Sequence, residues 1–223
     1  ASLLPPLEVA DNPQEDLKIA LELFQKLILI LSGASSTFED RENNKDYKYI
    51  WNWLCFVIKY PKIKHTALQI TGKQGDGKGT LKEIMELIVG KDKVYVSINP
   101  ARDVFGNFNE GCKNALFIIF EEASKSCMSK NGGTGQLKSL ITDPTLIINE
   151  KHKPAYQIHS NIHIIAFSNT NNAITDIPTD DRRMCAFRTD SETLFETLEE
   201  KAQFYHDIHT KVIENERALR FLY

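Results

Sequence analysis

Apolar residues recur at helical spacing near the start of the chain. Between residues 13 and 31 they fall at positions 17, 20, 21, 24, 27, 28 and 31, which places them on one face of a helix opened by Asp11-Asn12-Pro13. A polar stretch follows, and residues 47–60 then carry the aromatic and aliphatic positions of a second helix. Pro61 ends this helix, because proline has no amide hydrogen to donate. The pattern predicts two amphipathic helices at the start of the chain.

Short apolar runs replace the helical spacing from His65 onward. Their length and their content of β-branched and aromatic residues are typical of strands. Because the runs alternate with helical or loop segments, the pattern indicates an α/β fold with a parallel sheet flanked by helices. We predict strands at residues 66–70, 94–98, 115–120, 162–167 and 184–187.

The last part of the chain returns to helical spacing. The expected buried side of this region carries Leu194, Leu198, Phe204, Ile208 and Val212. We therefore divide the chain into an N-terminal helical segment (residues 1–62), an α/β core (63–190) and a C-terminal helical segment (191–223).

The composition is typical of a globular protein with a sizeable core. The chain has 223 residues, of which 42% are hydrophobic and 26% charged. It contains no uncharged apolar run of about 18 residues, and its first residues lack the basic and apolar regions of a signal peptide. We therefore expect an intracellular protein with no membrane partner.

Neither the net charge nor the cysteines indicate a site. The formal net charge of −3 gives no overall basic field, so any contact with nucleic acid must be local. The cysteines lie far apart with no Cys-x-x-Cys pair, which predicts reduced thiols instead of disulfides or a zinc site. They are Cys55, Cys112, Cys127 and Cys185.

Residues 72–80 read GKQGDGKGT and lie between a predicted strand and a predicted helix. Glycine is costly in either element, because it loses the most backbone entropy on ordering, so the run must need bare backbone. In this setting backbone amides and the helix N-terminus bind phosphate, and Lys78 reaches the outer phosphates. We predict a P-loop that binds a nucleoside triphosphate through Gly72, Gly75, Asp76, Gly77, Lys78, Gly79 and Thr80.

One position of the loop departs from the P-loop pattern GxxxxGK[ST]. Gly72, Gly77 and Lys78 match it, but Gly79 stands where the magnesium-binding hydroxyl is expected, and Thr80 comes one residue later. Either Thr80 or a water molecule would then bind the magnesium ion.

Hydrolysis of a bound nucleotide needs carboxylates near the phosphates. One predicted strand ends in Glu121 and Glu122, at the edge where parallel strands gather their ligands. We assign Glu121 to magnesium and Glu122 to activation of water. Another predicted strand ends just before Asn169, whose amide could orient the water or contact the γ-phosphate. Arg182 or Arg183 could then stabilise transition-state charge on the nucleotide of a neighbouring subunit.

Together these motifs resemble those of the superfamily 3 helicases, the AAA+-like motors of viral DNA replication, and in particular the helicase half of phage and large-virus primase-helicases. The resemblance runs through WNWLCFVIKYPK, ITGKQGDGKGT, FGNFNE, LFIIFEEA, LKSLIT, NEKHK, IIAFSNT and DDRRMCAF, in that order. It implies that Lys78 belongs to the Walker A loop, Glu121 and Glu122 to the Walker B acids, and Asn169 to a polar sensor. The arginine that acts in trans would be Arg182 or Arg183.

The resemblance also implies a hairpin whose basic tip grips single-stranded DNA. The matching stretch is INEKHKPAYQI, with Lys151, His152 and Lys153 at the expected tip. Lys138, in the segment before it, is a further candidate. A lysine or two per subunit can follow phosphates without reading bases.

A member of this family would hydrolyse ATP with Mg²⁺ and would translocate 3′ to 5′ along single-stranded DNA as a homo-hexameric ring. The N-terminal helices would form the collar-like segment, and a primase domain would precede them on the full-length polypeptide. Such a protein would act in the host cell cytoplasm or at a viral replication site.

Two other functions remain open. The run GDGKGT also occurs in nucleoside monophosphate kinases, but here two helices precede the loop and no lid-like cluster of arginines is present in the sequence. A nucleotide-gated assembly module that does not hydrolyse ATP is the other alternative, and Glu121 and Glu122 argue against it.

Overall fold

The computed structural model describes residues 13–33, 37–121, 133–169 and 181–223. Contacts along the chain divide it into two compact units. The first unit comprises Ala1–Asn52, Gln74–Lys91 and Arg188–Tyr223, and the second comprises Trp53–Lys73 and Asp92–Phe187. A boundary between the units therefore falls inside the glycine-rich loop, after Lys73.

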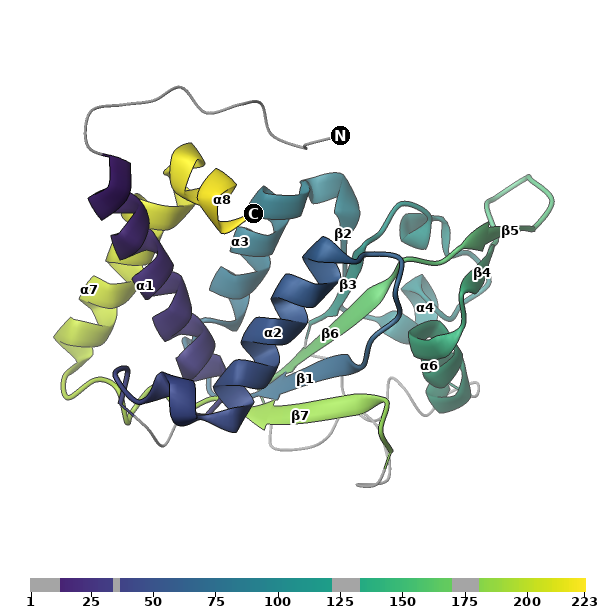
Figure 1. The fold of residues 1–223 in the computed structure, drawn as a ribbon. Coiled ribbons are helices and arrows are strands. Elements are labelled where there is room, and N and C mark those ends of the chain that lie inside the picture. Colours follow the sequence, from purple (N-terminus) through teal and green to yellow (C-terminus); the bar gives the residue numbers. More distant parts are fainter. Residues whose placement is uncertain (1–12, 34–36, 122–132, 170–180) are drawn as a thin grey trace. The chain divides into compact units, whose positions relative to one another are not determined.

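Helices from both ends of the chain pack together in the first unit (Figure 1). Helix α1 (Pro13–Leu31) lies against α7 (Leu198–Ile208) and α8 (Glu216–Leu222), and α3 (Lys78–Val89) lies against α8. Helix α7 continues into a π-helical turn, His209–Ile213, that contacts both α1 and α3. None of the helices in the described part of the chain is long and apolar enough to cross a membrane.

Both predicted N-terminal helices are confirmed. The apolar stripe of α1 is buried where it was expected, with Leu27, Ile28 and Leu31 at 0% exposure. A short 3₁₀ turn at Arg41–Asn43 precedes α2 (Lys45–Lys59), which crosses from the first unit into the second at Trp53.

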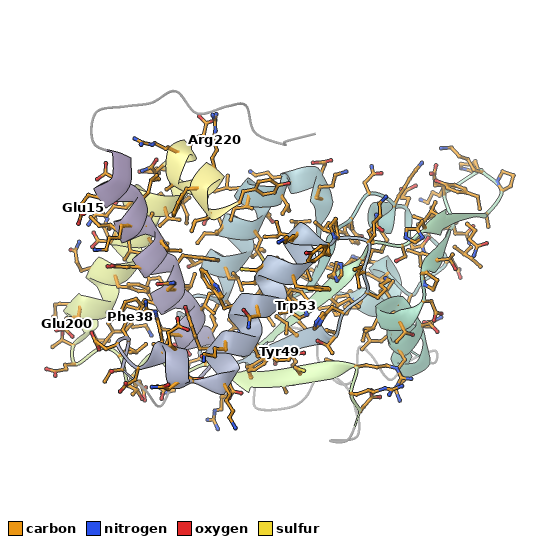
Figure 2. All side chains as sticks on the ribbon, viewed as in Figure 1. Glu15, Phe38, Tyr49, Trp53, Glu200 and Arg220 are labelled. Atoms are coloured by element: carbon orange, nitrogen blue, oxygen red, sulfur yellow. The ribbon has the colours of Figure 1, made fainter. Side chains whose placement is uncertain are left out.

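The predicted C-terminal helix is in fact two helices, and one of its predicted buried residues is wrong. Helix α7 begins at Leu198 because Thr197 caps it. The Thr197 hydroxyl accepts from the N–H of Glu200 at 3.1 Å, and the Glu200 carboxylate (Figure 2) accepts from the N–H of Thr197. Leu198 follows this cap and is 81% exposed, and Leu194 lies before the helix. The other three predicted residues are buried: Phe204, Ile208 and Val212.

The second unit is built on a five-stranded sheet with the order β2-β3-β6-β1-β7. The pairs β2–β3, β3–β6 and β1–β6 are parallel, and β7 lies beside β1. Each predicted strand overlaps an observed one, so the predicted α/β fold with a parallel sheet flanked by helices is confirmed. The strands are β1 (Ala67–Thr71), β2 (Val94–Ser97), β3 (Phe117–Phe120), β6 (His163–Ser168) and β7 (Met184–Arg188).

One face of the sheet packs against the short helices of the same unit. Ile118 of β3 and Ile164 of β6 join Leu137 in one core cluster. Leu137 belongs to α6 (Gly133–Thr142), and α4 (Pro100–Asp103) precedes the apolar Val104 of the same cluster. Residues 117–120 and 163–168 are buried throughout, as expected for central strands of a parallel sheet.

Trp53 covers the neighbouring positions of the same strands (Figure 2). Its ring lies 6.2 Å from that of Phe117 and 6.1 Å from that of His163, and its indole N–H donates to the carbonyl of Thr66 at 2.8 Å. The imidazole of His163 contacts the carbonyl of Pro61 through Nε2 at 3.1 Å, and its buried Nδ1 has no partner among the described residues.

A separate antiparallel hairpin extends from the second unit (Figure 1). It is formed by β4 (Thr145–Ile148) and β5 (Tyr156–His159), with Leu146 opposite Ile158. The apolar pattern did not predict these strands, since both are short and half exposed. The hairpin implied by the family resemblance is confirmed as a structural element.

Candidate functional site

The glycine-rich loop connects β1 to α3, as predicted. Its first residue, Gly72, donates its N–H to the carbonyl of Ser168 at 3.1 Å, which ties the start of the loop to β6. Gly75 and Gly77 have φ angles of +85° and +87°, a region that residues with a side chain rarely adopt. An added Cβ at Gly75 would meet nothing within 4 Å, so glycine is needed there for backbone conformation and not for space.

Helix α3 starts directly after the second of these glycines. Gly77 is its N-cap, accepts the first intrahelical hydrogen bond at 2.9 Å, and has no side chain with which to cap the helix. Lys78 is the first helical residue and is only 8% exposed; burial lowers its pKa, and the charge of Asp76 partly offsets that effect. Gly79 is exposed and Thr80 half-buried on the same turn. A helix N-terminus that follows a glycine loop and carries a lysine is suited to bind phosphate groups.

Asp76 differs from the other predicted residues of the loop. Its side chain is 2% exposed and accepts hydrogen bonds from the hydroxyls of Thr189 and Ser191, at 2.5 and 2.8 Å, and from Lys201 Nζ at 3.1 Å. Burial by itself would raise the pKa of Asp76, but these donors and the lysine charge outweigh it and hold the pKa below its ordinary value. The carboxylate is therefore directed into the protein, and the predicted contact of Asp76 with a nucleotide would come from its backbone.

Two further predicted residues lie at the carboxyl edge of the sheet. Glu121 follows β3 and is half-buried, and its N–H donates to the end of β2 at 3.0 Å. Asn169 follows β6 and is exposed. Because Thr71 pairs with Ser168, the glycine-rich loop leaves the sheet at this same edge. Glu122, the predicted base, lies outside the described residues.

The magnesium assignments of Glu121 and Thr80 stay predictions. Within the described ranges, no three His, Cys, Asp or Glu side chains come together as a metal-binding cluster. Magnesium at a P-loop is held largely by the phosphates of the nucleotide and by water, so a preformed cluster is not required. Cys55, Cys112 and Cys185 form no disulfide with one another, and Cys127 lies outside the described residues.

The basic tip of the hairpin lies in the segment between β4 and β5. Lys151, His152 and Lys153 are all exposed there, and His152 has a φ of 62°. Lys151 Nζ lies 5.8 Å from the ring centre of Phe108, which is itself 46% exposed. Where an exposed aromatic ring lies beside a lysine, the ring can stack on a base and the lysine can bind the adjacent phosphate.

Glu150 fixes the base of the same tip. It is 8% exposed and accepts from Lys153, from the Tyr156 hydroxyl at 2.5 Å and from Lys113 Nζ at 3.0 Å. These hydrogen bonds lower the pKa of Glu150 to about 2. The two lysines of the tip therefore differ, because Lys153 is held by an ion pair whereas Lys151 lies over an aromatic ring.

Two of the three remaining predicted basic residues pair with the carboxylate of Asp181. Lys138 Nζ lies 3.1 Å from the carboxylate of Asp181, which also accepts from Arg183 at 3.2 Å. Arg182 is exposed, and no partner for it lies among the described residues. Of the two candidate arginines, Arg182 is thus the one not held by Asp181.

Comparison with known proteins places the chain in a family. Residues 70–183, just over half of the chain, match the model of DUF5906, a family of unknown function. The chain belongs to the DUF5906 family. The DUF5906 match begins in β1 and ends just before β7, so it includes the glycine-rich loop, the carboxyl edge and the basic hairpin.

This DUF5906 chain is also homologous to the DNA primase-polymerase of Nitratiruptor phage NrS-1. The two are 32% identical over 133 residues, which cover 59% of this chain and 18% of the phage protein. Two solved structures of the NrS-1 C-terminal region share its fold, with TM-scores of 0.65 and 0.63 at 23% and 22% identity. They cover 99% and 98% of this chain, which spans 46% and 50% of the solved chains.

Sequence reasoning missed the residues that hold Asp76, as well as the ring beside Lys151. Thr189, Ser191 and Lys201 are 113 to 125 positions away from Asp76, so no local pattern connects them. One signal was present, because a carboxylate in a phosphate-binding loop needs a partner that neutralises it. Phe108 gave no such signal in the sequence.

Proposed function

We propose that this DUF5906 chain is the ATP-hydrolysing helicase motor of a phage replication protein. One observation carries the proposal: a glycine loop with two left-handed glycines leads from a buried parallel strand into a helix that begins at Lys78. That arrangement is typical of the P-loop of nucleotide-hydrolysing motors, which supports the proposal. Homology to a phage DNA primase-polymerase supports a role in replication.

In the proposed reaction the loop binds the triphosphate of ATP through its backbone amides, and Lys78 contacts the β- and γ-phosphates. Thr80 and Glu121 would bind Mg²⁺, which supplies charge neutralisation at the phosphates when present. Glu122 would accept a proton from the attacking water, and Asn169 would orient that water or contact the γ-phosphate.

The hairpin supplies the proposed contact with single-stranded DNA. Lys151, His152 and Lys153 are exposed at its tip, and Phe108 adds an aromatic surface beside them. We assign the DNA contact to this tip and not to Lys138, because Lys138 is paired with Asp181. Such contacts follow the strand without reading its sequence.

A ring of subunits would complete the site, with six copies expected from the family resemblance. We assign the arginine that reaches the neighbouring nucleotide to Arg182, since Arg183 is held by Asp181 and Arg182 is exposed. An arginine supplied by a second subunit makes hydrolysis depend on assembly.

The test is ATP hydrolysis by the purified chain over a range of protein concentrations, with and without a single-stranded DNA oligonucleotide. We expect the rate per subunit to rise with concentration and to increase when DNA is added. A rate per subunit that is flat with concentration and indifferent to DNA would contradict the motor. Rapid transfer of phosphate from ATP to AMP, CMP or TMP in the same samples would instead support the monophosphate kinase alternative.

A further inference from the structure

The carboxylate of Asp76 stands in an unusual place for a loop that binds anions. It lies between two glycines of left-handed conformation, Gly75 and Gly77, and two residues before Lys78. A free carboxylate there would repel the phosphates of a nucleotide. The protein must therefore neutralise Asp76 or direct it away, and the structure does both.

Three residues of the first unit bind the carboxylate of Asp76. Thr189 and Ser191 are 8% and 4% exposed and both donate to the carboxylate. Lys201 Nζ donates to Asp76 at 3.1 Å and to the Ser191 hydroxyl at 2.8 Å. Three donors from one segment thus bind one carboxylate, and the positive charge of the lysine offsets the charge of the carboxylate.

A second contact from the same helix meets the next residue of the loop. Tyr205 lies one helical turn after Lys201 on α7, so the two side chains share a face. A Cβ added to Gly77 would lie 3.0 Å from the Tyr205 hydroxyl and 2.5 Å from Cδ1 of Leu27, which shows how closely both side chains pack on the loop. The Tyr205 hydroxyl is buried and has no hydrogen-bond partner among the described residues, so the contact with Gly77 is one of packing by the end of the side chain.

We propose that Lys201 and Tyr205 of α7 are positioning residues that hold the glycine-rich loop in the conformation that binds ATP. The inference rests on the proposed function. Both residues lie outside the loop and contact it through Asp76 and Gly77. Helix α7 fixes two consecutive loop residues, Asp76 through the ion pair and Gly77 through packing. The amides of the loop are therefore ordered before the nucleotide binds. A loop that is already ordered loses less entropy on binding, so its affinity is higher.

The main test compares Lys201→Met, which removes the charge at similar length, with Lys201→Arg, which keeps it. A matched control is Lys211→Met, which removes an ion-paired lysine of the same C-terminal segment whose partner is Asp207. Affinity for Mg·ATP is measured by titration, and exchange of the amide hydrogens of residues 72–80 is measured without nucleotide. We expect Lys201→Met to weaken ATP binding about 10-fold or more, which is about 1.4 kcal/mol, and to speed exchange in the loop. Lys201→Arg should stay close to wild type, and Lys211→Met should change neither quantity.

A double variant separates positioning from the effect of an unpaired buried charge. Lys201→Met leaves Asp76 without its cation, which by itself can unfold a protein. Asp76→Asn with Lys201→Met removes both charges at nearly the same volume. We expect this double variant to fold and still to bind ATP more weakly than wild type. Wild-type affinity in the double variant would overturn the proposed role of the ion pair.

Tyr205 offers a second matched pair. Tyr205→Phe keeps the ring and should bind ATP as wild type does, whereas Tyr205→Ala should weaken binding and speed loop exchange. Weaker binding by Tyr205→Phe would show that the hydroxyl reaches the nucleotide, and would overturn the statement that the residue acts only through the loop.

Failure of this inference and failure of the proposed function have different signatures. A wild-type chain that binds no ATP would contradict the proposed function, and loop exchange would then still show whether α7 holds the loop. ATP binding by Lys201→Met at wild-type affinity, with faster loop exchange, would mean that the contact supports the fold alone and would overturn the positioning role.

Discussion

His163 is a histidine that the fold keeps neutral. It is 2% exposed in β6 and packs edge-on against Trp53, with an interplanar angle of 90°. Burial lowers its pKa from 6.5 to about 4, although the carbonyl of Pro61 acts in the opposite direction. The charges of Lys64 and His65 act on this pKa in the same direction as burial, and the value of about 4 includes them. A proton on this ring would have little compensation.

The pH dependence of stability follows from the difference between the pKa of His163 in the unfolded chain and in the folded chain. Below pH 6.5 the unfolded chain binds a proton at His163, and the folded chain does not until about pH 4. Stability should therefore fall as the pH drops through this window, by about 3 kcal/mol for this residue at pH 4. Urea denaturation of wild type and His163→Gln at pH 7, 5.5 and 4.5 gives the free energy of unfolding at each pH. The effect is the difference between the two proteins in the slope of this free energy against pH.

A control for this comparison is His206→Gln, since His206 is exposed and has no ion pair among the described residues. This variant should keep the wild-type slope. Equal slopes for wild type and His163→Gln would contradict a neutral buried imidazole.

At the scale of elements, the turn from β1 into α3 depends on glycine for two separate reasons. Gly75 needs only the left-handed conformation, whereas a Cβ at Gly77 would also displace the side-chain ends of Leu27 and Tyr205. Gly79 has neither constraint. Substitution by alanine should therefore have graded effects along one short loop.

We expect Gly77→Ala to destabilise the fold most, by about 2–4 kcal/mol, as left-handed strain adds to overpacking. Gly75→Ala should cost about 1–2 kcal/mol from strain alone. Gly79→Ala serves as the control and should be neutral or stabilising, because alanine favours helix. Chemical denaturation of the three variants gives the order, and a Gly77→Ala protein as stable as Gly79→Ala would contradict the packing of α1 and α7 on the loop.

The basic hairpin makes a prediction about DNA affinity. Lys151→Ala with Lys153→Ala should weaken binding of a single-stranded oligonucleotide and lower the slope of log affinity against log salt by about 1, since roughly 0.7 is lost per phosphate contact. Lys151→Ala alone should account for most of the loss, because Lys153 is paired with Glu150. ATP hydrolysis without DNA should be unchanged.

The matched control for the hairpin is Lys59→Ala with Lys62→Ala, which removes the same charge from two exposed lysines outside the hairpin. Its DNA affinity and salt slope should equal those of wild type. An equal loss in both double variants would mean that net charge and not the hairpin binds the strand.

How well each element could be predicted depends on where its partners lie in the sequence. Strands β3 and β6 are buried on both faces and therefore read as unbroken apolar runs. Strands β4 and β5 are short and alternate in exposure, with Ile147 63% exposed, so the pattern alone did not reveal them. The exposure of Leu198 depends on a cap formed at Thr197, which helical spacing does not encode.

The same reasoning applies to the candidate site. The glycine loop and Lys78 were predictable because strand, loop and helix are contiguous in the chain. The network of Asp76 was not, since Thr189, Ser191 and Lys201 lie 113 to 125 positions further along the sequence. Nor did the sequence distinguish Arg182 from Arg183, because the difference lies in the ion pair of Arg183 with Asp181.

For the whole molecule, the proposed ring predicts complementation between two inactive proteins. Lys78→Ala lacks a working loop but keeps its arginine, and Arg182→Ala keeps the loop but lacks the arginine. In a random equal mixture roughly one interface in four joins an intact loop to an intact arginine, so hydrolysis should recover to at most about a quarter of the wild-type rate.

The control replaces Lys78→Ala in the mixture by the double variant Lys78→Ala with Arg182→Ala. No interface then has an intact arginine, and the rate should stay at background. Activity of Arg182→Ala by itself, or an absence of recovery in the first mixture, would contradict an arginine supplied by the neighbouring subunit.

The network around Asp76 also sets an order of events during synthesis. The loop leaves the ribosome before the residues that bind Asp76, which follow 113 to 125 positions later. Every residue of the five-stranded sheet except the last of β7 belongs to Trp53–Lys73 and Asp92–Phe187, all of which is translated before Lys201. A nascent chain can therefore complete its sheet before the residues that hold Asp76 have been synthesised, so the glycine-rich loop gains these contacts after the sheet has formed.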